Sequence, residues 1–387
     1  MKLADRLGHL GTETAFLVFS KAKDLEAQGM EMVHLEIGEP DFDTPGNIID
    51  SAIEALQNHW THYCPSAGLI ELRETVAEDI SKRRGVKVGP ENVVITPGGK
   101  PIIIFAMLAL VNPGEEVIYP NPGYPIYESI INFIGAKPVP VKMHQERQFR
   151  LDVDELRSLV SPKTRMIVIN SPHNPTGSVL TREDLEAIAE IAVANDIYVL
   201  ADEIYNRIIY DGEHVSITNF PGMLERTIIL DGFSKTYAMT GWRIGYGVMP
   251  EKLAIQVAKL QTNTNSCTAA FTQVACIEAM RGDQSEVDRM VGQFKKRRDF
   301  FIDGLGQIKG FDCHKPQGAF YLFPNITELG LKSSAMEEKL MMEGGIAALA
   351  GTSFGAYGEG YLRFSYATSL ASIESALGKL ESFVKKL

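Results

Sequence analysis

Short apolar runs that alternate with longer helical patterns constrain the fold of this chain more than any other feature. One helical pattern covers residues 182–192 and begins after Thr181, a residue type favoured at the N-cap. Strands that alternate with helices are typical of a mostly parallel sheet with helices on both faces. We therefore predict an α/β protein. The expected strands are residues 92–96, 116–119, 137–141, 166–170, 197–201, 227–230 and 243–248.

The length of 387 residues is enough for two domains. We expect a large domain at residues 46–285, which contains all of the apolar runs. The N-terminal segment 1–45 and the C-terminal segment 286–387 are expected to form a smaller α/β domain together. A charged helix around 287–305 and a final helix at 372–386 belong to its C-terminal part. The chain has no internal repeat and no low-complexity linker.

Composition and charge exclude several classes of protein. A net charge of −11 argues against a nucleic acid partner, because phosphate backbones need a basic face. No apolar stretch approaches the roughly 20 residues of a membrane span, and the N-terminus lacks a signal-peptide core. The histidines show no metal-ligand spacing, so we expect no metal site. We expect a cytoplasmic protein with reduced thiols at Cys64, Cys267, Cys276 and Cys313.

Lys235 follows the apolar run at 227–230, within Gly-Phe-Ser-Lys-Thr. The end of a strand in an open α/β sheet is where such sheets bind ligands. A lysine there is poorly solvated, which lowers its pKa and frees the amine, so Lys235 is a candidate nucleophile for Schiff-base formation. A lone lysine after a strand is more commonly a surface residue. The neighbouring motifs favour the catalytic interpretation.

Three further motifs accompany other strands. Asn174 lies in Ser-Pro-His-Asn-Pro-Thr-Gly after residues 166–170, Asp202 directly follows the run at 197–201, and Arg243 lies in Thr-Gly-Trp-Arg-Ile-Gly. The ordered set Asn-Pro-x-Gly, Asp-x-x-Tyr, Ser-Lys and Gly-x-Arg resembles the fold-type I, class I and II aminotransferases. These enzymes use pyridoxal 5′-phosphate (PLP). The resemblance covers essentially the whole chain and implies a large PLP-binding domain with a smaller domain made from both chain ends.

The resemblance implies a role for several side chains around the PLP ring. Lys235 matches the lysine that carries the cofactor, and Asp202 matches the carboxylate that keeps the pyridine nitrogen protonated. Tyr205 and Asn174 match the donors to the phenolic oxygen. Tyr124 matches the aromatic residue that stacks on the ring. Structural roles remain open alternatives: Asp202 could cap a turn, Asn174 could be a turn residue, and Tyr124 could belong to the core.

The segment Thr-Pro-Gly-Gly-Lys at 96–100 follows a strand and opens an apolar helix. Glycines at a helix N-terminus let backbone N–H groups approach a phosphate. The resemblance makes this segment the phosphate cup. Gly232 stands where several family members have a serine, which removes one possible phosphate hydroxyl. The expected ligands are Gly99, Lys100, Ser234, Arg243 and, in the neighbouring subunit's site, Tyr63.

Arg363 matches the arginine that binds the substrate α-carboxylate, where a bidentate pair fixes orientation as well as charge. Alternatively, Arg363 is a surface residue on the polar face of a strand. Gly38, Phe320 and the loop at 351–355 are expected to shape the rest of the substrate pocket, and Tyr124 and Asn174 are expected to contact the substrate as well.

Lys100 is the residue that indicates which substrate side chain the enzyme prefers. One subgroup of bacterial aspartate aminotransferases has Gly-Gly-Lys here, and its lysine contacts the distal carboxylate of aspartate or glutamate. This implies a dicarboxylate substrate, by a charge-assisted hydrogen bond of roughly 1.5–3 kcal/mol. Glu13 opposes that expectation. If it reaches the pocket, it pairs with Lys100 and leaves a preference for alanine or another neutral donor.

The expected function is amino transfer from an L-amino acid to a 2-oxo acid, with aspartate or glutamate as donor and 2-oxoglutarate or oxaloacetate as acceptor. The resemblance implies a homodimer with active sites shared between subunits. An alanine, broad or aromatic aminotransferase and a PLP-dependent carbon–sulfur lyase remain alternatives. A transcription regulator with an aminotransferase-like domain is a further alternative, which the acidic composition disfavours.

Overall fold

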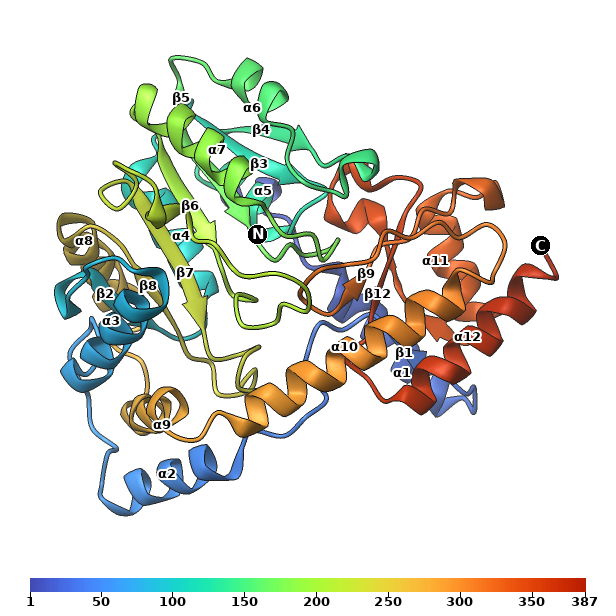
Figure 1. Ribbon diagram of the computed structural model, residues 1–387, viewed down its shortest axis with the longest axis horizontal. Helices are drawn as coiled ribbons and strands as arrows, with labels where there is room; N and C mark the ends of the chain where they lie inside the picture. The colour runs from blue at the N-terminus through green and yellow to red at the C-terminus, as the bar shows by residue number, and fades with distance from the viewer.

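The centre of the molecule is a seven-stranded sheet in the order β2-β8-β7-β6-β5-β3-β4 (Figure 1). The computed structural model describes residues 1–387. Every apolar run that predicted a strand falls in this sheet, so the prediction is confirmed. Its strands are β2 (Val93–Thr96), β3 (Glu116–Asn121), β4 (Lys137–Lys142), β5 (Thr164–Asn170), β6 (Tyr198–Asp202), β7 (Thr227–Gly232) and β8 (Gly245–Val248).

Strand direction in this sheet is mostly parallel, as predicted. The strands from β7 through β6, β5 and β3 to β4 are all parallel. β8 is antiparallel to both of its neighbours, β7 and β2. A parallel return from β7 would need a crossover of a dozen or more residues, usually a helix, whereas residues 233–244 contain no helix. This connection holds Lys235 and Arg243 close to the carboxyl end of β7.

Helices cover both faces of the sheet. α4, α5 and α8 pack over Met166 and Val168, whereas α7 packs over Ile167 and Ile169 on the opposite face. No helix of the chain is both long enough and apolar enough to cross a membrane. The helices are α1 (Thr14–Ala27), α2 (Gly46–Gln57), α3 (Ile70–Arg84), α4 (Lys100–Leu110), α5 (Ile126–Phe133), α6 (Val153–Leu159), α7 (Arg182–Ala194), α8 (Glu251–Thr264), α9 (Ala270–Arg281), α10 (Ser285–Leu305), α11 (Ser333–Met342) and α12 (Leu370–Val384).

Local sequence explains where several helices begin and end. The Thr181 hydroxyl accepts a hydrogen bond from the Asp184 N–H at 3.2 Å, and the Asp184 carboxylate accepts one from the Thr181 N–H at 2.9 Å. This reciprocal pair is a capping box and confirms Thr181 as the N-cap of α7. α3 ends at Arg84 and is followed by Gly85, whose φ of 63° is the left-handed conformation favoured just after a helix.

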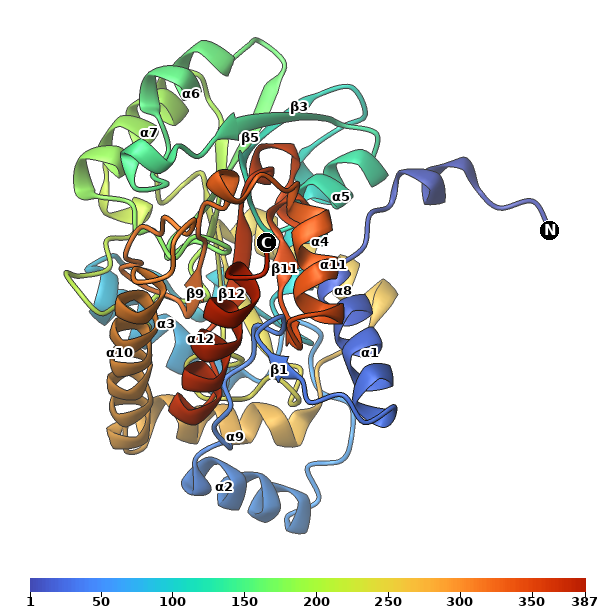
Figure 2. The same ribbon diagram turned by 90° about the vertical axis from the view of Figure 1, so that its right-hand side faces the viewer.

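Segments from both chain ends pair beside the large sheet. β1 (Val33–His34) runs parallel to β10 (Ile346–Ala347). β12 (Leu362–Ser365) lies between β11 (Leu349–Ala350) and β9 (Tyr321–Leu322). Figure 2 shows α1 and β1 on the same side of the molecule as α11 and α12, while the residues before α1 extend away as an arm. The two ends of the chain therefore form one α/β layer.

The carboxyl ends of the parallel strands bring the polar motif residues to one edge. Asn170 ends β5 and Asp202 ends β6, and the two are direct partners in the strand register. Gly232 ends β7, next to β6. Because parallel strands present their carboxyl ends on the same side, the motif residues that follow them converge there.

Candidate active site

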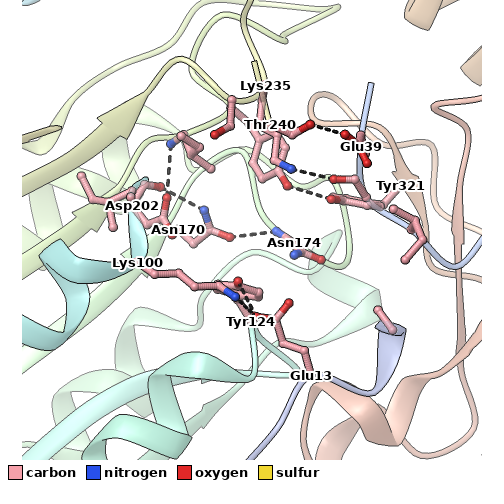
Figure 3. Close-up of a pocket in the computed structure, with 18 of the residues that line it drawn as sticks. Glu13, Glu39, Lys100, Tyr124, Asn170, Asn174, Asp202, Lys235, Thr240 and Tyr321 are labelled. Atoms are coloured by element: carbon pink, nitrogen blue, oxygen red, sulfur yellow. Dashed lines mark hydrogen bonds and ion pairs between the residues drawn. The ribbon is translucent and has the colours of Figure 1, made fainter. Parts of the chain in front are cut away.

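A cavity of about 540 Å³ opens at this edge, between the large sheet and the layer made from the chain ends (Figure 3). It is lined by side chains from β5, β6, β12 and α4 and from the β7–β8 connection. The structure therefore brings nearly all of the sequence-predicted site residues to one place. Those in the lining are Gly38, Gly99, Lys100, Tyr124, Asn174, Asp202, Tyr205, Ser234, Lys235, Arg243 and Arg363.

Lys235 is partly accessible from the cavity, and its amine donates a 2.6 Å hydrogen bond to the Gly38 carbonyl. Burial lowers the pKa of Lys235 to about 8, and the nearby Glu39 carboxylate acts against that shift. An amine with such a pKa has a substantial neutral fraction near neutral pH. It can therefore act as a nucleophile or as a base, which agrees with the expectation from the sequence.

Asp202 is buried at the end of β6. Its carboxylate accepts a 2.6 Å hydrogen bond from the Tyr127 hydroxyl and a 3.2 Å hydrogen bond from the Ile204 N–H. Burial raises the pKa of Asp202 to about 6, and these two donors act in the opposite direction. The group is therefore an anion at neutral pH inside a poorly solvated wall, ready to face a cation in the cavity.

Asn170 was not singled out in the sequence, yet it orders this edge of the cavity. Its side-chain amide donates to the Asp202 carbonyl at 2.9 Å and to the Pro172 carbonyl at 3.1 Å. Its side-chain oxygen accepts from the Asn174 N–H at 2.8 Å. Asn170 therefore fixes the turn that presents Asn174. The only signal in the sequence was its position as the last residue of an apolar run.

The anion-binding end of the cavity lies at the start of α4. Gly98 has a φ of 88° and Gly99 is the N-cap of α4. A Cβ atom at Gly98 would overlap the guanidinium of Arg243, so a glycine lets the backbone and Arg243 approach each other closely. Free N–H groups at the helix start, the Arg243 guanidinium and the buried Ser234 hydroxyl make a cradle suited to a phosphate.

Arg363 is buried in β12, and its guanidinium lies 4.5 Å from the ring centre of Tyr321 and 4.9 Å from that of Phe354. It donates to the Glu36 carbonyl and, at 3.4 Å, to Asn174. Its Nε has no hydrogen-bond partner. Burial lowers the pKa of Arg363. Arg363 lines the cavity, and a buried guanidinium in such a wall fits a substrate carboxylate.

Comparison with known proteins agrees with this geometry. The family model for aminotransferase class I and II matches residues 30–380. The chain belongs to this family. Class I and II aminotransferases such as aspartate aminotransferase use PLP, so the expected cofactor and the expected reaction class, amino transfer between amino acids and 2-oxo acids, are confirmed.

Similar aminotransferases share the full length of this chain. Aromatic-amino-acid aminotransferase 2 of Thermococcus litoralis is 40% identical and covers 100% of this chain and 99% of its own length. Aspartate aminotransferase of Pyrococcus abyssi is also 40% identical, with the same coverage. The solved aspartate aminotransferase of Thermus thermophilus with maleate is 34% identical, has a TM-score of 0.95 and covers 99% of this chain and 100% of its own.

The cavity of this aminotransferase fits PLP chemically. An amine for the aldehyde, a carboxylate for the ring nitrogen and a cradle for the phosphate are all present in its wall. Tyr205 is buried, and its hydroxyl shares a 2.7 Å hydrogen bond with the hydroxyl of Tyr321. Tyr321 was missed in the sequence: its neighbour Phe320 and the loop at 351–355 were expected at the pocket, but Tyr321 is in the lining and they are not. A Cβ atom at Gly38 would overlap the Tyr321 hydroxyl, so Gly38 leaves room for that tyrosine.

Tyr63 is the one predicted cofactor ligand outside the cavity lining. Its side chain is 90% exposed in the single chain. This position agrees with a residue that serves a neighbouring subunit, and its role stays a prediction.

Lys100 forms an ion pair with Glu13. The same Glu13 oxygen accepts a 2.9 Å hydrogen bond from the Tyr124 hydroxyl (Figure 3). The conditional expectation from the sequence is thus met: Glu13 reaches the pocket. The Lys100 side chain therefore faces Glu13 and Tyr124, while its backbone begins α4.

Proposed function

We propose that this aminotransferase uses aspartate or glutamate as amino donor and 2-oxoglutarate or oxaloacetate as acceptor. The observation that carries the proposal is the presence of two cations, Arg363 and Lys100, in the wall of one cavity. A dicarboxylate carries two charges that can meet them, and each charge-assisted hydrogen bond contributes about 1.5–3 kcal/mol. The names of several relatives, among them aspartate aminotransferases, support the same substrate class.

The test is a panel of L-amino acids assayed with each 2-oxo acid. Aspartate and glutamate are expected to give the highest kcat/KM, and the amino group is expected to appear on the acceptor. Release of ammonia and pyruvate from cystathionine, without amino transfer, would instead indicate a carbon–sulfur lyase. Turnover of alanine above both dicarboxylates would reject the substrate assignment and keep the reaction class.

Different residues of the cavity are proposed to have different roles in the reaction. PLP, when bound, withdraws electrons from the Cα of the amino acid once its ring nitrogen is protonated. Asp202 holds that proton in place by its negative charge. The neutral amine of Lys235 acts as a base and removes the proton from Cα. The ammonium formed then acts as an acid and would donate this proton to the aldehyde carbon of the cofactor. A pKa of about 8 suits both directions of that transfer.

Arg363 orients the substrate by pairing with its α-carboxylate, so that Cα lies within reach of Lys235. The rings of Tyr321 and Phe354 flank the guanidinium and keep water from it. Asn174 contacts the same guanidinium and is proposed, with Tyr205, to donate to the phenolic oxygen of the cofactor. The aromatic face of Tyr124 is proposed to stack on the cofactor ring.

A neutral or aromatic amino donor is a second candidate. The Glu13–Lys100 pair leaves no net charge at the side-chain end of the cavity. One relative is named an aromatic-amino-acid aminotransferase, which supports a site of this kind. Phenylalanine, tyrosine and alanine therefore belong in the donor panel.

We also propose a cytoplasmic homodimer in which Tyr63 reaches the phosphate site of the partner. The supporting observation is an exposed tyrosine next to other exposed apolar side chains in α2 and the segment after it: Ile49, Ile53, Leu56 and Trp60. Light scattering is expected to give twice the mass of the 42.7 kDa chain. Replacement of Tyr63 by Phe is expected to weaken PLP binding. A monomer with unchanged PLP affinity would reject the shared site.

The domain division proposed is 1–45 and 286–387 against 46–285. The pairing of β1 with β10 supports it, since it joins the two chain ends. Limited proteolysis tests the division: early cleavage is expected near residues 45 and 285.

A further inference from the structure

Glu13 occupies the side-chain end of the substrate cavity, although it comes from the start of the chain. It precedes α1, and its carboxylate meets both the Lys100 amine and the Tyr124 hydroxyl through one oxygen. The side chains of Lys100 and Glu13 are 42% and 22% exposed, so the pair lies at the mouth of the cavity and not in the core. Glu13 thus takes the place that a substrate carboxylate would need in order to reach Lys100.

We propose that Glu13 is a displaceable counter-ion for Lys100 that lets one side-chain site accept both neutral and dicarboxylate substrates. With a neutral side chain in the cavity, Glu13 stays on Lys100. With a dicarboxylate, the distal carboxylate of the substrate replaces Glu13 on Lys100 and Tyr124. This inference rests on the proposed aminotransferase substrates and names the residue that selects among them.

The bound state of Glu13 suits an apolar substrate side chain. An ammonium next to an apolar group loses hydration without gaining a partner, which is unfavourable. Glu13 supplies that partner from within the chain. Apolar groups line the same cavity, among them Phe16, Ile37 and Ile103. A neutral side chain can therefore pack against these residues while the Lys100 charge remains compensated.

The released state of Glu13 needs only a local change. Glu13 makes no side-chain capping bond to α1. The residues before Glu13 are exposed. The Gly11 N–H donates a 2.9 Å hydrogen bond to the Ser129 hydroxyl, which attaches this segment to the rest of the molecule. Rotation of the Glu13 side chain toward solvent therefore leaves α1 in place. One carboxylate replaces another on Lys100, so the charge in the cavity stays balanced.

This exchange reduces the affinity for dicarboxylates, because the substrate must first displace Glu13. When a ligand competes with an internal group, its apparent affinity equals the intrinsic affinity multiplied by the fraction of molecules in which the site is free. Replacement of Glu13 by Gln keeps the size and an acceptor for Tyr124 but removes the charge. Glu13→Gln is therefore expected to strengthen dicarboxylate binding about tenfold or more.

The experiment compares two unreactive ligands on the PLP-loaded enzyme by calorimetry: succinate, a dicarboxylate, and 3-phenylpropionate, an apolar monocarboxylate. Glu13→Gln is expected to tighten succinate binding about tenfold and to leave 3-phenylpropionate unchanged or weaker. Glu13→Ala is expected to increase the affinity for succinate as well. The control is Asp5→Asn, which removes one charge from the exposed arm outside the cavity and is expected to leave both ligands unchanged.

A double variant identifies Lys100 as the group that Glu13 neutralises. In a Lys100→Ala background, Glu13→Gln is expected to lose most of its effect on succinate, since no cation remains to be released. The proposal is overturned if Glu13→Gln weakens succinate, if it shifts both ligands equally, or if its effect persists without Lys100.

Steady-state kinetics on the same proteins separate this inference from the proposed function. The ratio of kcat/KM for glutamate to that for phenylalanine is expected to rise about tenfold or more in Glu13→Gln. If no amino acid is turned over while the succinate pattern appears, the proposed function fails and the role of Glu13 holds. If donors are turned over but the ratio and the succinate affinity stay unchanged, the role of Glu13 fails alone.

Discussion

The Tyr127 hydroxyl donates a 2.6 Å hydrogen bond to the Asp202 carboxylate, and both side chains are buried. Burial raises the pKa of Asp202 to about 6, and the bond from Tyr127 acts against that rise. Tyr127 therefore helps to keep Asp202 ionised at the pH where its charge is needed. It is a positioning residue, because it acts through Asp202 and does not line the cavity itself.

Replacement of Tyr127 by Phe is expected to raise the pKa of Asp202, because the anion loses a donor while burial stays the same. The midpoint of the acid limb of the pH–activity profile should then move up by about one pH unit, while activity at alkaline pH stays unchanged. The pH profile of kcat/KM measures this shift. Tyr119→Phe is the matched control, a buried tyrosine of β3 with no bond to Asp202. An unmoved acid limb in Tyr127→Phe would argue against the coupling.

Replacement of Asp202 by Ala is expected to lower kcat by about a hundredfold or more and to change KM much less. The reason is that the charge of Asp202 serves the chemical step, and substrate binding depends mainly on other groups. Steady-state kinetics with the best donor of the panel provide the measurement. A mutant with the kcat of the parent enzyme would rule out the proposed role.

Replacement of Arg363 by Lys is expected to raise KM for every amino donor, by about tenfold to a hundredfold. An ammonium lacks the planar fork that pairs with a carboxylate and cannot satisfy the same neighbours. Arg157→Lys, at an exposed position of α6, is the control. If KM were unchanged in Arg363→Lys, the α-carboxylate would have to bind elsewhere.

The pKa of Lys235 also predicts how the apo-protein captures PLP. Burial lowers the pKa of this amine from 10.5 to about 8, so the neutral fraction grows as the pH rises through 8. The rate of covalent capture is therefore expected to rise with pH, to reach half its maximum near pH 8 and to level off at higher pH. Absorbance after mixing apo-protein with PLP follows the reaction. A midpoint near 10.5 would mean that the amine is not desolvated.

The strands and the main site motifs could be predicted from the sequence because both depend on local pattern. The apolar runs became strands, and Asn174, Asp202 and Lys235 follow strand ends that share one edge of the sheet. The direction of β8 was not predicted, because it depends on the connection after β7 and not on the composition of β8.

Contacts between distant segments could not be predicted in the same way. Tyr127, Tyr321 and Asn170 look like ordinary residues of a helix or a strand. Only folding places Tyr127 and Asn170 against Asp202, and Tyr321 against Tyr205. The sequence predicts the Glu13–Lys100 pair only on the condition that Glu13 reaches the pocket, because nothing in the local sequence shows that the start of the chain enters the cavity.

Lys235 is proposed to carry the cofactor, and reduction of the bound cofactor in place tests this assignment directly. The PLP-loaded protein is reduced with borohydride, which makes the link between lysine and cofactor permanent, and the labelled peptide is identified by mass spectrometry. Label is expected on the peptide that contains Lys235, and no label is expected in Lys235→Ala. Stoichiometric label on any other lysine would contradict it.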